Sequence, residues 1–261
     1  MVIDNRVGAG GSIGAGIVAK SPADGYTLLV HSSAQAVNAF IYPSLPYDTL
    51  KDFAQVAPIA GQPNVLVVNP ASGYKTVADL VADAKKRPGA LNFGSAGIGS
   101  GTHLNAEKFK LAAAINVLHI PYKGTPEALT DTMAGRIAYF FSPISAALPL
   151  VRDGKLAALG VSSVKRAGLL PGTPTIAETG LPGFEYNLWV GMFAPAGTPA
   201  DVVDKINRDL NRVLRDADVA ARIAALGAEP MSMSPAEFDR FMRSEMDDAA
   251  RIVKAGNIKV Q

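Results

Sequence analysis

Residues 92–103 read Asn92-Phe93-Gly94-Ser95-Ala96-Gly97-Ile98-Gly99-Ser100-Gly101-Thr102-His103, a Gly-rich stretch between a predicted strand and a predicted helix. The apolar run 90–94 predicts a β-strand, and a helical pattern begins near Thr102. The small residues between them expose backbone N–H groups at a helix N-terminus, where unpaired donors and the helix dipole favour an anion. The turn lacks the Gly-Lys-Ser/Thr ending of a phosphate-binding loop, so a carboxylate fits it better than a nucleotide. The alternative is a purely structural Gly-rich connection.

Outward from this turn, the next predicted strand, 117–122, ends in a second loop of the same kind. Pro121-Tyr122-Lys123-Gly124-Thr125-Pro126 leads into another predicted helix. Loops that follow successive parallel strands meet at the carboxyl edge of the sheet, where open α/β sheets bind ligands. Tyr122, Lys123 and Gly124 are therefore candidate ligand contacts, unless Tyr122 only packs and Lys123 is only a solvated charge.

A third polar stretch, 31–38, follows the predicted strand 26–31 and suits a polar ligand through its hydroxyl and amide groups. With the first two loops, it completes a set of candidate ligand-binding residues. The set comprises Ser32, Ser33, Asn38, Ser95, Ala96, Gly97, Gly99, Ser100, Thr102, His103, Tyr122, Lys123 and Gly124.

Short β-rich runs alternate with helical patterns along most of the chain, which predicts an α/β fold built from βαβ units around mainly parallel sheets. The further strands are expected at 64–69, 137–141, 156–162 and 188–194, and the further helices at 14–20, 76–87, 126–134 and 145–153. The C-terminal third differs, because 198–226 and 234–255 read as two long amphipathic helices. No linker separates independent domains.

Composition narrows the function further. The 261 residues carry 25 Lys and Arg against 23 Asp and Glu, and no basic stripe points to nucleic acid. The absence of Cys excludes thiol catalysis, disulfides and Cys-ligated metal. No apolar run is long enough to span a bilayer, and the first residues lack the apolar core of a signal peptide. The three histidines lack metal-ligand spacing, so we expect neither a metal nor a cofactor.

A hydrolase is the main competing interpretation. Gly10-Gly11-Ser12-Ile13-Gly14 matches the G-x-S-x-G nucleophile elbow, and its setting before a helix is compatible with one. The histidines, at 31, 103 and 119, stand far from the late position that such a triad normally uses. A tight turn that lets a helix pack closely is the simpler role for these glycines.

Several stretches together resemble the substrate-binding proteins of tripartite tricarboxylate transporters, the Bug family of extracytoplasmic solute receptors. They occur in the family's order from Val2 to the last helix. They are Asp4-Asn5-Arg6-x-Gly8-Ala9-Gly10-Gly11, Ser21-Pro22-x-Asp24-Gly25-Tyr26-Thr27-Leu28, Leu45-Pro46-Tyr47-Asp48, Gly94-Ser95-Ala96-Gly97-x-Gly99-Ser100, Pro121-Tyr122-Lys123-Gly124, Trp189-x-Gly191 and Ala194-Pro195-Ala196-Gly197-Thr198-Pro199.

The resemblance implies a two-lobed periplasmic-binding-protein fold of type II, with residues 1–67 and 190–261 in lobe I and 68–189 in lobe II. It implies hinge strands near 64–69 and 188–194, a periplasmic location, and capture of a di- or tricarboxylate or aromatic acid between the lobes for membrane transporter subunits. The family's carboxylate contacts fall on 95–103, its second pocket stretch on 122–124, and its first-lobe loop on Ser32, Ser33 and Asn38.

Two departures from the family pattern matter. Family members carry a signal peptide, a strand and a helix ahead of the Asp-Asn-Arg segment, so this chain is expected to be N-terminally truncated, with exposed apolar edges in lobe I. At Tyr139-Phe140-Phe141-Ser142 the family commonly has an Asp, whose absence disfavours an amino-acid ligand. We therefore expect a carboxylate receptor that performs no chemistry. A serine esterase using Ser12 and a non-transporting remnant are the alternatives.

Overall fold

Two long strands, β2 (Phe53–Val68) and β7 (Asn187–Pro195), run through both parts of the chain. The computed structural model describes residues 2–6 and 8–258. It divides into two compact units, Met1–Gly61 with Trp189–Gln261 (unit 1) and Gln62–Leu188 (unit 2), and both boundaries fall within β2 and β7. The predicted lobe limits of 67/68 and 189/190 and the hinge role of these strands stay predictions.

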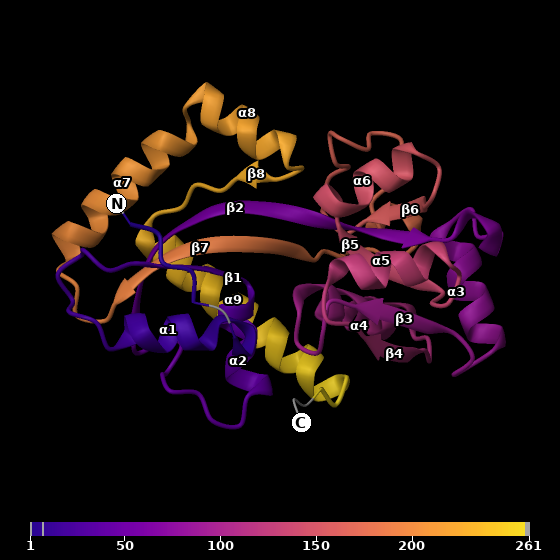
Figure 1. The fold of residues 1–261 in the computed structure, drawn as a ribbon, viewed down its shortest axis with the longest axis horizontal. Helices are drawn as coiled ribbons and strands as arrows, with labels where there is room; N and C mark the ends of the chain where they lie inside the picture. Colours follow the sequence, from indigo (N-terminus) through magenta and orange to yellow (C-terminus); the bar gives the residue numbers. More distant parts are fainter. Residues whose placement is uncertain (1, 7, 259–261) are drawn as a thin grey trace. The chain divides into compact units, whose positions relative to one another are not determined.

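Unit 1 is a sheet covered by helices on both faces (Figure 1). Phe53, Phe193 and Phe238 pack on the face covered by α1 and α9, and Val56, Ala194 and Val203 pack on the face covered by α7. The elements besides β2 and β7 are α1 (Ser12–Ala19), β1 (Leu29–Ser32), α2 (Ala34–Ile41), α7 (Ala200–Leu214), α8 (Ala217–Ala225), β8 (Glu229–Pro230) and α9 (Pro235–Ala255).

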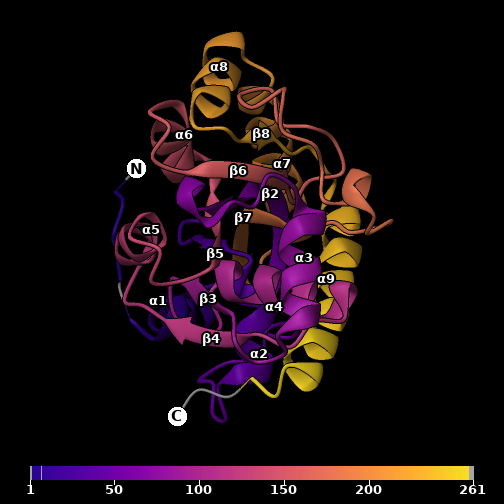
Figure 2. The ribbon, with the colours of Figure 1, turned by 90° about the vertical axis from the view of Figure 1, so that its right-hand side faces the viewer.

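Unit 2 has the same three layers, and Figure 2 shows α5 and α6 on one side of its strands and α3 and α4 on the other. Alternation along β2 and β5 explains this arrangement. Leu66 and Phe141 enter the core under α3 and α4, whereas Val67 and Phe140 enter the core under α5 and α6. The elements are α3 (Val77–Lys86), β3 (Asn92–Ser95), α4 (Gly101–Ala113), β4 (Leu118–Pro121), α5 (Thr125–Met133), β5 (Tyr139–Pro143), α6 (Ile144–Arg152) and β6 (Ala157–Val161).

The predicted α/β class is confirmed, but the sheets are mixed rather than mainly parallel. β3 pairs parallel with β4 and β5, whereas β2 pairs antiparallel with β5, β6 and β8, and β1 pairs antiparallel with β7. Strand direction follows from which strands become neighbours, and an apolar run has the same composition in either direction. The sequence pattern therefore identified strands without their orientation.

Two local predictions were wrong. The expected helix 198–226 is two helices, because Asp216 adopts an extended conformation and its side chain accepts hydrogen bonds from the N–H groups of Asp218 and Val219, which starts α8. The polar stretch 31–38 is not a loop either, since α2 begins directly after Ser33 and buries Ala36, Val37 and Ile41.

The β1 side of unit 1 exposes apolar side chains. Within the described residues, β7 is the only strand that pairs with β1. Val30 on β1 is 55% exposed, and Ile13 and Ile17 on α1 are each 49% exposed. The expected N-terminal truncation, and the apolar edges that it would expose in lobe I, stay predictions.

Leu80→Ala tests the core of unit 2. Leu80 on α3 is fully buried in the cluster formed with Leu66, Phe109 and Phe141. We expect the substitution to lower the free energy of unfolding of the full chain by about 2–5 kcal/mol, because it leaves a cavity. Urea denaturation measures the loss. The control Leu111→Ala, at a 43% exposed position on α4, should stay within about 0.5 kcal/mol; equal losses would contradict the packing described.

Candidate functional site

The turn between β3 and α4 is built by its own hydroxyl groups. The Thr102 hydroxyl accepts the Ala96 N–H at 2.9 Å and lies 2.9 Å from the Ser100 hydroxyl. The Ser100 hydroxyl donates to the Gly97 carbonyl at 2.7 Å and accepts the His103 N–H at 3.3 Å, which caps α4. The Ser95 hydroxyl donates to the Gly97 carbonyl and accepts the Gly97 N–H, each at 3.1 Å. These hydroxyls therefore fold residues 95–103 into one fixed turn.

The start of α4 carries backbone N–H groups that have no acceptor within the helix. Gly101 and Thr102 occupy the first two helical positions, whose N–H groups cannot reach a helix carbonyl. The first turn of α4 holds no acidic residue, so no side chain of that turn offsets the positive end of the helix dipole. This end of α4 can accept an anion.

The second predicted loop lies beside the first. β3 and β4 pair parallel with Ser95 opposite Pro121, and the Tyr122 N–H donates to the Ser95 carbonyl at 3.0 Å. The Tyr122 hydroxyl donates a hydrogen bond to Asp131 at 2.8 Å. Burial, and after it this hydrogen bond, raises the pKa of Tyr122 to about 12. Lys123 is exposed, and Gly124 precedes α5.

The helix that follows this loop differs electrostatically from α4. Glu127 stands in the first turn of α5, close to Gly124: a Cβ built on that glycine would lie 3.2 Å from the Glu127 carboxylate. This carboxylate partly offsets the dipole at the start of α5. Of the two neighbouring helix starts, α4 is the more favourable for an anion.

The predicted contacts of unit 1 have local structural roles. The Asn38 side-chain amide donates to the Gly10 carbonyl at 3.0 Å, the buried Ser33 N–H donates to the Trp189 carbonyl, and Ser32 is exposed. Thus Asn38 joins α2 to the glycine turn 8–11. The proposed ligand contacts of Ser32, Ser33 and Asn38 stay predictions, as do those of the residues in unit 2.

In the glycine turn 8–11, the backbone packs directly against the His31 side chain. Gly10 and Gly11 have positive φ values of 61° and 85°, and a Cβ on Gly11 would lie 2.0 Å from His31 Nε2. Only glycine fits there. Ser12 begins α1 and is buried, and within the described residues no hydrogen bond joins its hydroxyl to a histidine. Nothing in this arrangement supports the serine hydrolase.

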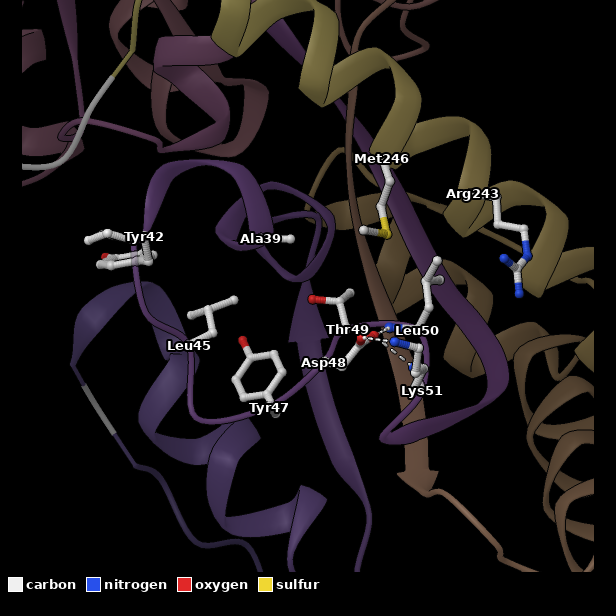
Figure 3. Close-up of a pocket in the computed structure, with 11 residues that line it drawn as sticks. Ala39, Tyr42, Leu45, Tyr47, Asp48, Thr49, Leu50, Lys51, Arg243 and Met246 are labelled. Atoms are coloured by element: carbon white, nitrogen blue, oxygen red, sulfur yellow. Dashed lines mark hydrogen bonds and ion pairs between the residues drawn. The ribbon is translucent and has the colours of Figure 1, made fainter.

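A surface pocket of about 620 Å³ lies in unit 1 and is lined by residues of the 39–51 segment with Arg243 and Met246 of α9 (Figure 3). Its cations are paired with neighbouring carboxylates, Lys51 with Asp48 at 3.0 Å and Arg243 with Asp239 at 2.8 Å. None of the predicted ligand contacts lines it. Sequence reasoning did not identify this pocket, because tyrosines and paired charges in a loop carry no distinctive pattern.

Residues 2–6 and 8–258 contain neither a metal-type side-chain cluster nor a membrane-spanning helix. No cluster of three or more His, Cys, Asp or Glu side chains suited to a metal ion is present there. Likewise, within those ranges no helix combines the length and the apolar character needed to cross a membrane.

Known proteins of one receptor family resemble this chain over most of its length. Residues 1–258 match the model of the tripartite tricarboxylate transporter family receptor. BugT of Bordetella pertussis is 37% identical over 263 residues, which span the whole of this chain and 81% of BugT. A protein of Pseudomonas sp. strain P51, encoded in the tcbD–tcbE intergenic region, is 37% identical over 97% of this chain and 76% of its own length.

Solved structures agree with this match. Rpa4515 of R. palustris with adipate has a TM-score of 0.87 and 36% identity, over 99% of this chain and 87% of its own. The periplasmic binding protein BugD has a TM-score of 0.83 and 30% identity, over 99% of this chain and 88% of BugD. MatC of Rhodopseudomonas palustris with bound malate has a TM-score of 0.77 and 30% identity, over 94% of this chain and 85% of MatC. The fold is that of the periplasmic binding proteins. The chain belongs to the tripartite tricarboxylate transporter receptor family, as its sequence motifs predicted.

Thr102→Val tests how the turn is held. The variant keeps the side-chain shape but removes the oxygen that accepts the Ala96 N–H. We expect a loss of about 1 kcal/mol in the local stability of the turn, since the part-buried Ala96 N–H loses its acceptor. Hydrogen exchange at Ala96 measures it. Thr130→Val is the matched control, because the exposed Thr130 hydroxyl only donates to the Pro126 carbonyl. Unchanged exchange at Ala96 in Thr102→Val would contradict the assignment.

Proposed function

We propose that this protein is a periplasmic receptor that binds a small organic dicarboxylate or related acid and delivers it to the membrane subunits of its transporter. The observation that carries the proposal is the uncompensated N-terminus of α4, in a chain whose relatives Rpa4515 and MatC were solved with adipate and malate. The role is binding without catalysis, since the family consists of transporter receptors.

One carboxylate of the ligand is bound by backbone N–H groups in the first turn of α4. The hydroxyls of Ser95, Ser100 and Thr102 shape this turn through hydrogen bonds within it. Backbone donors and the helix dipole stabilise a carboxylate without a side-chain cation. The exposed Lys123, in the adjacent loop, adds a favourable positive potential.

A charge placed on the turn tests this proposal. Ile98 lies within the turn and is 41% exposed, so its replacement leaves the core intact. Ile98→Asp should weaken adipate or malate binding about tenfold, since the new carboxylate repels the ligand and competes for the same N–H donors. Titration calorimetry with both acids measures it.

The neutral variant Ile98→Asn has almost the same shape as Ile98→Asp and serves as the matched control. Its affinity should stay within about threefold of that of the parent protein. Equal affinities of the two variants for the acid that binds best would place the carboxylate elsewhere. If neither these acids nor a wider panel of di- and tricarboxylates and aromatic acids binds the parent protein, the receptor proposal fails.

A further inference from the structure

A buried histidine, His103, and a half-buried histidine, His119, contact the candidate anion turn. His103 Nδ1 accepts the Gly99 N–H at 3.1 Å, and His119 Nε2 lies 2.6 Å from the Ser95 hydroxyl. Only 4% of the His103 side chain is exposed. Both contacts are made to the backbone or side chain of the 95–101 turn, so the rings determine where that turn lies.

The two rings form the end of an aromatic stack. His103 and His119 are nearly parallel, with their centroids 3.8 Å apart and their planes inclined by 12°. Phe93 stacks on His119 at 4.9 Å, and Tyr139 stacks on Phe93 at 5.6 Å. Because these rings are packed face to face, neither imidazole can turn without disturbing β3, β4 and β5.

The hydrogen bond from Gly99 determines the tautomer of His103. A ring nitrogen that accepts an N–H carries no proton, so the His103 proton is on Nε2. That nitrogen faces the Glu107 carboxylate one helical turn along α4, at 3.8 Å. Glu107 is 2% exposed and forms an ion pair with Lys110 at 2.6 Å. Thus Glu107 stabilises the tautomer in which Nδ1 is free to accept the Gly99 N–H.

We propose that His103, with its Nδ1 accepting the Gly99 N–H, and His119, through Ser95, are positioning residues that hold the 95–101 turn in its anion-binding shape. This inference rests on the proposed function for its consequence, a carboxylate bound at α4, but not for the positioning itself. Neither histidine contacts the ligand. The neutral ring is essential, because protonated Nδ1 would present a donor to the Gly99 N–H.

The surroundings keep both rings neutral. Burial and the neighbouring His119 lower the pKa of His103 to about 3, and burial lowers the pKa of His119 to about 4. The two histidines are titratable neighbours of each other. The other titratable groups around them are Glu107 and Lys110 of α4 and Tyr139 of β5. Lys110 opposes protonation of both rings. Glu107 favours protonation of His103, but it is already paired with Lys110.

The lowered pKa values make the stability of the folded turn depend on pH. Each ring has a lower pKa in the folded protein than its ordinary value of 6.5, so protons bind the unfolded chain more readily. The stability contributed by the neutral rings is complete above pH 6.5 and decreases as the pH falls towards 3–4. The turn should therefore keep its shape from pH 8 to 5, and open below about pH 4 as the rings become charged.

The experiment uses amide analogues of the imidazole. His103→Asn places a carbonyl oxygen near the position of Nδ1, whereas His103→Gln places its amide near Nε2 and leaves the Gly99 N–H without an acceptor. We expect hydrogen exchange at Gly99 in the full chain to rise at least tenfold in His103→Gln and less than threefold in His103→Asn. Exchange at Phe141, in the core of unit 2, reports any general destabilisation. Nitrogen NMR of the parent protein should show His103 protonated at Nε2 only, from pH 8 to 5.

Calorimetry of the same variants with adipate and malate separates this inference from the proposed function. The affinity should fall about tenfold in His103→Gln and be largely restored in His103→Asn. A His103 proton on Nδ1, or equal Gly99 exchange in both variants, would overturn the positioning role. The same holds if the parent binds an acid and His103→Gln binds it equally well. If exchange and NMR agree with the proposal but no acid binds, the positioning role stands and the receptor function fails.

Discussion

The structure of unit 2 depends on one requirement, that the backbone N–H groups of the β3–α4 turn be satisfied without closing the end of α4. Four polar side chains meet it. Thr102, Ser95, His103 and Ser100 accept the N–H groups of Ala96, Gly97, Gly99 and His103, respectively. What remains is the first turn of the helix, at Gly101 and Thr102. The hydroxyls of Ser95, Ser100 and Thr102, predicted from the sequence as ligand contacts, form hydrogen bonds within the turn, and whether they also contact a ligand stays a prediction.

This division of roles determines which groups can be charged. An anion at the start of α4 does not require a cation among the buried side chains, because the helix dipole and N–H groups supply the positive potential. The imidazoles can then stay neutral and act as hydrogen-bond partners. Glu107, buried one turn below His103, is paired with Lys110 rather than with a protonated ring. The buried network is thus close to neutral overall, which reduces the cost of removing it from water.

The sequence predicted the positions of most strands, because β3, β4, β5 and β6 are short apolar runs bounded by Gly, Pro and polar residues. It also predicted the two turns after β3 and β4 as neighbours, since parallel pairing places both at one edge of the sheet. It did not reveal that β2 begins at Phe53, because Gly61 and Pro63 interrupt the pattern expected of one long strand. The inward direction of the hydroxyls and the His103–His119 stack depend on contacts between β4 and α4, which no local pattern shows.

Recognition by backbone donors also bears on how one family accommodates different acids. Rpa4515 was solved with adipate and MatC with malate, which share carboxylates but differ in length and in a hydroxyl group. N–H groups at a helix start recognise the carboxylate itself and are insensitive to the rest of the molecule. In this chain those groups are held by residues behind the turn rather than by the ligand. On the proposed function, a mutation that alters ligand choice can leave 95–103 unchanged, whereas the loss of the His103 acceptor weakens the binding of each carboxylate by a similar factor. If the carboxylate binds at α4 as proposed, selectivity comes from side chains that contact the remainder of the acid, and the residues behind the turn contribute to affinity for the shared carboxylate.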